Sequence, residues 1–149
     1  MKIIAQNKKI SFDFEISESF EAGIILKGHE VKSLREGNVN IRSAYASVRG
    51  DEIFMCGVSI ARFEKTQDNI DEKRDRKLLL HKKEIGKIDI SLKTKGITCM
   101  VRKLYFKKGL AKAEVVLARG RKKYDKRRLL KERAMDKEAK NAIKVSSKM

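Results

Sequence analysis

The apolar and polar positions in the first part of the chain alternate as they do in short β-strands. Residues 12–16 interleave apolar and acidic side chains, which predicts a half-buried strand. Residues 22–26 form a short apolar run, which predicts a buried strand. Residues 44–49 and 52–60 lie on either side of a Gly-Asp pair suited to a tight turn, and they therefore predict a β-hairpin.

A second hairpin is predicted near residue 108. Residues 97–106 and 111–118 have the composition of strands, and a Lys-Lys-Gly-Leu segment joins them. In the last strand the alternation predicts that Ala111, Ala113, Val115 and Leu117 point inward, with Lys112 and Glu114 pointing out. The chain therefore favours antiparallel pairing.

Helical patterns are few. Residues 30–36 are long enough for about two turns, and Gly37 is a suitable C-terminal stop. Residues 64–76 are polar and predict a surface loop. The next segment predicts an amphipathic helix, because Leu78, Ile85, Ile88 and Leu92 recur at helical spacing beside Lys77, Lys82 and Lys83. Many short strands with few helices indicate a mainly β fold, either a small antiparallel barrel or a sandwich.

The last 30 residues differ in composition from the rest of the chain. They carry 12 cations against 4 anions, so this segment holds +8 of the total net charge of +17. From residue 125 onward the pattern is helical, but large apolar side chains are too few for a core. We expect a folded domain over residues 1–119 and a basic, flexible tail over residues 120–149 that is disordered alone and folds on a partner.

The charge also limits the class of partner. Charged residues make up 38% of the chain and the isoelectric point is about 10.0, which favours a polyanion such as nucleic acid. A membrane is the weaker alternative, because the chain has no run of about 18 apolar residues. The apolar stretch at the N-terminus is too short for a signal peptide, so we expect a cytoplasmic protein.

No pattern of catalytic residues is evident. The chain has no GxxxxGK[ST] loop and no GxGxxG, and neither a Ser-His-Asp nor a Cys-His signature surrounds His29 or His81. Cys56 and Cys99 lie far apart in apolar segments, which predicts reduced thiols in the core rather than a zinc site. We therefore expect no enzyme activity, no metal and no cofactor.

Basic clusters recur along the chain and favour nucleic acid. They include 7–9, 74–77, 82–83, 102–103, 107–108 and the tail. Tyr124, which has no core to enter, is the best candidate for stacking on an unpaired base. Glu21 and Glu30 are acids in basic surroundings, and two interpretations stay open: intramolecular ion pairs, or acceptors for amino groups and 2′-hydroxyls of RNA.

Several motifs, taken together and in order from Asn7 to Arg133, resemble the SmpB family. In the front half these are Asn7-Lys8-Lys9, Glu21-Ala22-Gly23-Ile24, and Gly28 to Arg35 followed by Gly37 and Asn40. In the back half they are Arg76 to Lys82, Tyr105-Phe106-Lys107, Gly120 to Arg127, and Lys131-Glu132-Arg133.

The resemblance implies a small OB-like antiparallel β-barrel with two or three helices and a flexible C-terminal tail. It also implies a monomer that binds the tRNA-like domain of tmRNA, brings it to stalled ribosomes and supports trans-translation. Carried over residue by residue, the tmRNA-binding residues would be Asn7, Lys8, Lys9, Glu21, Glu30, Lys32, Leu79 and Lys112. The tail residues for the decoding centre and its small-subunit rRNA would be Tyr124, Asp125, Lys126 and Arg127.

This sequence departs from the family pattern at two places. Tyr124 stands where relatives often have histidine, and the loop over residues 64–76 lacks the expected prolines. A second hypothesis belongs to a different class: a general basic ribosomal or nucleic-acid-binding structural protein without a tRNA-like target. Preference among RNA competitors would separate the two hypotheses.

Overall fold

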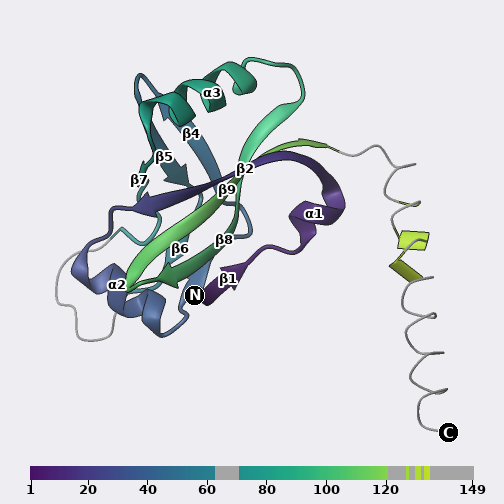
Figure 1. The fold of residues 1–149 in the computed structure, drawn as a ribbon. Coiled ribbons are helices and arrows are strands. Elements are labelled where there is room, and N and C mark those ends of the chain that lie inside the picture. The colour runs from purple at the N-terminus through teal and green to yellow at the C-terminus, as the bar shows by residue number, and fades with distance from the viewer. Residues whose placement is uncertain (63–70, 121–126, 128–129, 132, 135–149) are drawn as a thin grey trace, which may run out of the picture.

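The computed structural model describes residues 1–62, 71–120, 127, 130, 131, 133 and 134 (Figure 1). The helices are α1 (Lys9–Asp13), α2 (Gly28–Arg35) and α3 (Lys82–Leu92). The first strands are β1 (Lys2–Gln6), β2 (Phe14–Ile24), β3 (Val39–Asn40), β4 (Tyr45–Arg49) and β5 (Glu52–Cys56). The later ones are β6 (Ser59–Ile60), β7 (Arg76–Leu79), β8 (Ile97–Lys107) and β9 (Leu110–Gly120).

The long strands close into a ring. Their order in the sheet is β1-β8-β4-β5-β7-β2-β9, and β8 also pairs with β9, so the sheet returns to itself with β1 as an added strand on β8. Every pairing in this sheet is antiparallel. The prediction of a mainly β barrel is therefore confirmed, and the sandwich alternative is excluded.

Apolar side chains fill the inside of the ring. The alternation along each strand sends one set of residues inward, and direct cross-strand partners such as Leu104, Ala113 and Ala22 are fully buried. In β9 the predicted inward residues Ala113, Val115 and Leu117 are buried, and Ala111 is partly buried. Both cysteines are free thiols in this core, as predicted.

Helices α2 and α3 begin with the same capping interaction, in which a glutamate side chain accepts a hydrogen bond from the backbone N–H of the N-cap residue. The backbone N–H of Lys27 donates to Glu30 Oε1 at 2.8 Å, and that of His81 donates to Glu84 Oε1 at 3.2 Å. Helix α3 turns Ile85 and Ile88 into the core and packs against β8 and β4. In Figure 1 it covers one end of the ring, while α2 lies near the opposite end.

The two predicted hairpins are present. Strands β4 and β5 pair up to Arg49 and Glu52 around the turn at Gly50, and β8 and β9 pair up to Lys107 and Leu110. The first hairpin's second arm is shorter than predicted, because the ring strand β5 ends at Cys56 and residues 59–60 pair elsewhere as β6. Gly57 makes this break possible: its φ is +72°, and a Cβ there would lie 2.3 Å from the carbonyl oxygen of Ser43.

Two predictions near the N-terminal strands need correction. Residues 12–13 belong to α1 rather than to a strand, and residues 14–24 form one long strand, β2, rather than two short ones. Helix α1 is only 5 residues long and depends on tertiary contact, since its Ile10 is almost completely buried. A helix of one turn leaves no periodic pattern to detect.

The predicted helix near Leu78 also begins later than expected. Leu78 lies on β7 with its partner Ile53, and the helix starts at Lys82. Leu78 and Ile85 are 7 residues apart, and this interval matches a helical period although the two residues belong to different elements. The prediction of a surface loop fails at Arg76, which lies on β7 and is fully buried. Residues 64–70 of that loop lie outside the described part.

Candidate nucleic-acid interface

Two rows of residues run side by side across the outer face of β1, β8, β9, β2 and β7. Within each row neighbouring residues are direct cross-strand partners, so their side chains share one face of the sheet. The first row consists of Gln6, Lys103, Glu114 and Glu21. The second row consists of Ile3, Tyr105, Lys112, Gly23 and Leu79. We call these residues the outward band.

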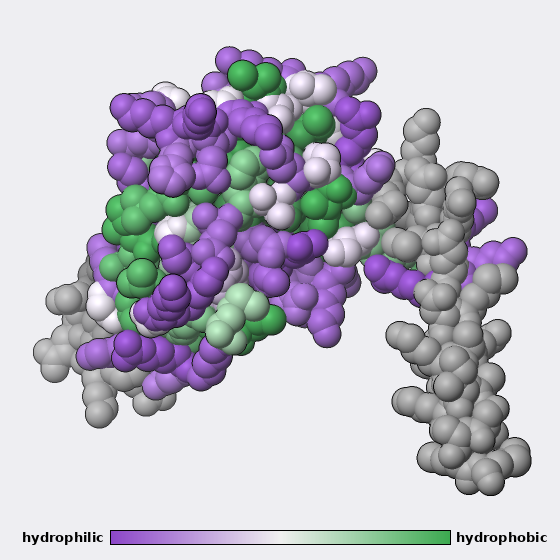
Figure 2. Space-filling view, in the orientation of Figure 1, coloured by the Kyte–Doolittle hydropathy of each residue, from purple (hydrophilic) through white to green (hydrophobic). Residues whose placement is uncertain are grey.

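The outward band brings together Glu21, Leu79 and Lys112, which are far apart in the sequence. Gly23 stands between Lys112 and Leu79 in the second row. A Cβ at Gly23 would approach the Cβ of Leu79 to 3.3 Å, so glycine leaves room for the leucine at this place. Leu79 is 54% exposed, and Figure 2 shows a hydrophobic patch among hydrophilic side chains over the ends of β2 and β7. An exposed apolar side chain beside a lysine suits contact with a nucleotide.

Glu21 is held in a fixed position on this face. The hydroxyl of Tyr105 donates to Glu21 Oε2 at 2.5 Å, and Lys107 Nζ donates to the same oxygen at 3.4 Å. These contacts, first that of Tyr105 and then that of Lys107, lower the pKa of Glu21 from its ordinary value of 4.5. Burial and the bond to Glu21 raise the pKa of Tyr105, so the phenol keeps its proton. Intramolecular pairing is thus present, and Glu21 is still exposed.

A second carboxylate, Glu114, lies directly across the strands from Glu21. Like charges in facing positions repel each other unless each has its own partner. Glu114 has two: Arg102 forms an ion pair with Oε1, and Lys103 Nζ lies 3.2 Å from Oε2. The bulge between Val101 and Lys103 places both cations beside Glu114. Lys103 also lies over the ring of Tyr105, 5.9 Å from its centroid.

The Asn7-Lys8-Lys9 block lies at the edge of the outward band. The N–H of Asn7 donates to the Arg102 carbonyl at 2.8 Å, which continues the pairing of β1 with β8. The Asn7 amide donates to the Arg42 carbonyl at 3.3 Å. Lys8 and Lys9 are exposed at the start of α1. The fold thus places this block next to Lys103.

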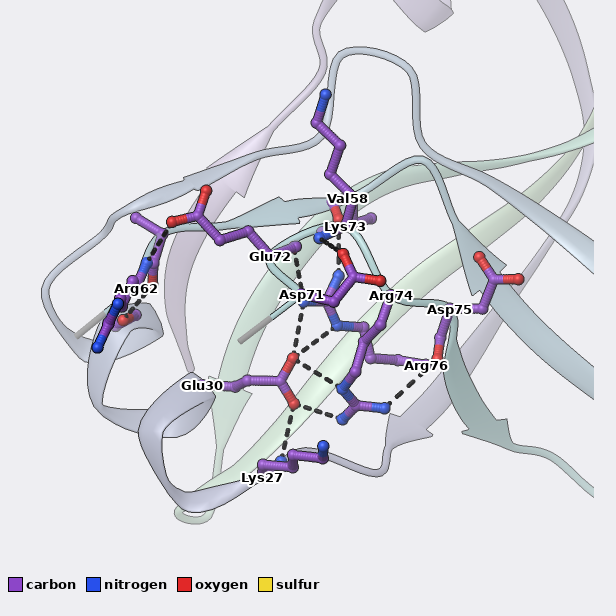
Figure 3. A network of polar contacts seen from close by, with 12 residues as sticks. Lys27, Glu30, Val58, Arg62, Asp71, Glu72, Lys73, Arg74, Asp75 and Arg76 are labelled. Carbon is purple, nitrogen blue, oxygen red and sulfur yellow. Dashed lines mark hydrogen bonds and ion pairs between the residues drawn. The ribbon is translucent and has the colours of Figure 1, made fainter. Parts of the chain in front are cut away.

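The resemblance implies Glu30 as an RNA contact, whereas the structure favours the alternative interpretation, an intramolecular ion pair. The residue is 1% exposed, and Figure 3 shows its carboxylate surrounded by Lys27, Arg74 and Arg76. Arg74 binds both oxygens, and Arg76 Nε donates to Oε2 at 2.8 Å. Burial alone would raise the pKa of Glu30, but the bonds from Arg74, the Lys27 N–H and Arg76 outweigh it and lower the pKa. A ligand cannot reach this carboxylate without displacing its arginines.

Arg76 has further partners that sequence reasoning did not find. It donates to the carbonyl of Val58 at 2.6 Å and to that of Glu72 at 2.9 Å. The Glu30 cluster, defined as Glu30, Arg74 and Arg76, therefore joins α2 to β7 and to the segment before β6. The sequence places these residues in separate motifs, and no local signal pairs them.

The remaining predicted residues are not part of the outward band. Lys32 is on α2 and belongs to neither row. Of the tail set, Tyr124, Asp125 and Lys126 lie outside the described residues, and Arg127 is helical and exposed. Arg133 is also described, and its guanidinium lies 5.9 Å from the ring centroid of Phe12.

The described residues contain neither a membrane-spanning helix nor a cluster of metal ligands. No helix there is long and apolar enough to cross a membrane. Within the same ranges, His, Cys, Asp and Glu side chains form no group of three that could hold a metal ion.

The fold and the outward band define a small β-barrel protein whose outer face combines charged and apolar side chains. A family model described as "SmpB protein" matches residues 4–145. The chain belongs to the SmpB family, as the motifs indicated.

Individual relatives agree with this assignment. An SsrA-binding protein of Lactococcus lactis subsp. lactis (strain IL1403) is 47% identical, and the match covers 97% of this chain and 94% of that protein. One from a Nitratiruptor species is also 47% identical, with 97% and 98% covered. A solved structure described as "tmRNA-SmpB: a journey to the center of the bacterial ribosome" is similar, with a TM-score of 0.67 and 42% identity over 80% of this chain and 85% of that one.

Proposed function

We propose that this chain binds tmRNA through its tRNA-like domain, delivers it to stalled ribosomes and thereby supports trans-translation. The observation that carries the proposal is family membership over residues 4–145, together with relatives named as SsrA-binding proteins, SsrA being tmRNA. The outward band supports it, because Glu21, Leu79 and Lys112 share one face with the Asn7-Lys8-Lys9 block beside them. A net charge of +17 favours an RNA partner.

The tail has a separate role in this proposal. Residues 1–119 form the RNA-binding domain, and residues 120–149 enter the decoding centre and the empty message channel of the small subunit, where they become helical. Tyr124, Asp125, Lys126 and Arg127 would contact the decoding centre. The density of cations in this segment supports contact with rRNA. We also infer a monomer in the bacterial cytoplasm that binds RNA and has no catalytic role.

Competition among nucleic acids distinguishes this function from that of a general basic nucleic-acid-binding protein. The full chain should prefer tmRNA to equal lengths of transfer RNA or duplex DNA at one fixed salt concentration, because contacts to the outward band depend on RNA shape. A general binder would respond to phosphate density alone. Equal competition by all three nucleic acids, measured by filter binding or fluorescence anisotropy, would reject the proposed function.

The salt dependence of binding should identify individual phosphate contacts. If Lys112 neutralises one phosphate, Lys112→Ala should make the log–log slope of affinity against salt shallower by roughly 0.7 to 0.9. Lys8→Ala should have a similar effect. Lys95→Ala, on the loop after α3, is the matched control and should leave the slope unchanged. Unchanged slopes for both Lys112→Ala and Lys8→Ala would place the RNA on another face.

Glu21 offers a test of the outward band that does not depend on positive charge. If Glu21 accepts a hydrogen bond from RNA, Glu21→Ala should weaken binding by about tenfold, as expected for a charge-assisted hydrogen bond. The melting temperature should change little, because Glu21 is exposed and its ion pair with Lys107 lies at the surface. Glu15→Ala, at the other end of β2, is the control. Equal or tighter binding by Glu21→Ala would mean that Glu21 only offsets Lys107.

A further inference from the structure

A groove of about 910 Å³ lies beside the outward band. It runs between the segment from β1 into α1, residues 5–10, and the segment that follows α2, residues 39–42. Met100 of β8 completes the lining between them, together with Asp13 and Phe14. The volume is at the upper end of the range of about 300 to 1,000 Å³ that is typical of ligand-binding clefts.

The lining of the groove combines an apolar inner wall with a rim of three cations, and it includes one carboxylate, that of Asp13. Ala5, Val39 and Met100 are partly exposed and form the accessible part of the inner wall, and Ile10 and Ile41 lie almost completely buried behind it. Lys8, Lys9 and Arg42 are exposed at the rim. Within the described ranges, none of these three cations has an ion-pair partner among the salt bridges of the fold.

Two asparagines fix the position of Arg42 at this rim. The amide of Asn7 donates to the Arg42 carbonyl at 3.3 Å, and the N–H of Arg42 donates to Asn40 Oδ1 at 2.9 Å. The main chain of Arg42 is therefore held from both sides while its side chain stays exposed. A cation that is positioned before binding loses less conformational entropy when it meets a phosphate.

The groove is continuous with the proposed RNA-binding face. A smaller hollow of about 470 Å³ is lined by Gln6, Asn7, Lys8, Arg102 and Lys103, with Ser11 and Arg133. It shares Gln6, Asn7 and Lys8 with the groove, and Lys103 belongs to the outward band. An RNA strand on the outward band would therefore reach the groove by crossing residues 6–8.

We infer that this groove receives an unpaired nucleotide of the RNA partner. The base packs over the partly exposed apolar side chains of Ala5, Val39 and Met100, and the flanking phosphate lies at the rim formed by Lys8, Lys9 and Arg42. An unpaired base is required, since a base within a duplex is covered by its stacked neighbours and cannot enter. This inference deepens the proposed function and rests on it, because it assigns one class of RNA element to a defined part of the surface.

The test compares two RNA probes with the full chain: a single strand of about ten nucleotides and a duplex of about ten base pairs. Arg42→Glu should weaken single-strand binding by about tenfold and duplex binding by about twofold or less. Lys9→Glu, at the same rim, should show the same selectivity. Lys95→Glu makes the same change in charge on the loop after α3 and should reduce both affinities slightly and equally. Melting curves establish that each variant is folded.

Two results would overturn the inference. If Arg42→Glu and Lys9→Glu behave like Lys95→Glu, only net charge matters and the groove is not a site. If they weaken both probes equally and more than Lys95→Glu does, the rim contacts phosphate without an unpaired base. These outcomes are distinct from a failure of the proposed function, which would appear as a wild-type chain without preference for tmRNA.

Discussion

A chain truncated after Gly120 should fold normally, bind the tRNA-like domain of tmRNA and fail to support tagging on stalled ribosomes. Folding should survive because β9 is complete at Gly120, which pairs with Phe14 of β2, so every strand of the ring is retained. RNA affinity should fall by about tenfold at most, since the lost segment carries a net charge of +8 but none of the outward band. Tagging should fall to background in a reconstituted translation system.

A smaller change should reproduce most of this loss. Replacing Asp125, Lys126 and Arg127 by Ala in the full chain should remove most of the tagging with RNA binding retained. Lys148→Ala is the matched control, because it lowers the net charge by the same single unit at a tail position outside the proposed decoding-centre set. If the truncated chain tags at the normal rate, the tail serves only solubility or non-specific binding, and its proposed role is wrong.

Glu30→Ala should destabilise the barrel by about 3 to 5 kcal/mol, because removing one partner of a buried ion pair leaves an uncompensated charge. Without Glu30, the guanidinium of Arg76 would be the uncompensated charge. Its side chain is fully buried, and its remaining partners are the neutral carbonyl groups of Val58 and Glu72. The melting temperature should fall by roughly 10 to 15 °C. Thermal unfolding followed by circular dichroism measures this shift.

Glu36→Ala is the control for Glu30→Ala. It removes the same charge from an exposed residue at the end of the same helix, and it should change stability by about 0.5 kcal/mol or less. Below its lowered melting temperature, Glu30→Ala should bind RNA as the parent does, because this carboxylate is not on the surface. A melting temperature equal to that of Glu36→Ala would show that the Glu30 cluster does not hold the fold together.

The pH dependence of stability provides a second test of the Glu30 cluster. The folded chain lowers the pKa of Glu30 below its ordinary value of 4.5. Its charge therefore stabilises the fold above about pH 4.5, and this contribution is lost as the pH falls from there through the folded pKa. Glu30→Gln lacks this titration. The difference in melting temperature between parent and Glu30→Gln should thus be largest near neutral pH and shrink in acid.

Some elements could be predicted because their signals are local. The hairpins around Gly50 and Gly109 follow from glycines that adopt positive φ between two runs of strand-like residues. The inward side chains of β9 follow from alternation. Helix α1 and the start of α3 were not predicted correctly: α1 is a single turn held by the burial of Ile10, and Leu78 matches the helical period of α3 by coincidence.

In the candidate site too, the sequence indicates some residues, and only the fold shows how they contact one another. The family resemblance indicates Asn7, Glu21, Leu79 and Lys112, but no sequence pattern indicates that Tyr105 holds Glu21. That contact joins residues 84 positions apart through the pairing of β8, β9 and β2. For Glu30 the family resemblance implies a contact with RNA, whereas the structure encloses its carboxylate between Arg74 and Arg76.

By itself, the sequence determined the mainly β class, the basic tail, the two hairpins and the family, because these depend on neighbouring residues, on charge and on ordered motifs. The tertiary structure alone decided which charged residues are accessible. Glu21 and Glu30 are both glutamates in basic surroundings, yet one lies on the outer face of β2 and the other is enclosed by Arg74 and Arg76. Burial and ion pairing depend on which distant segments the closing of the ring brings together, and this is a property of the whole fold rather than of any local stretch of residues.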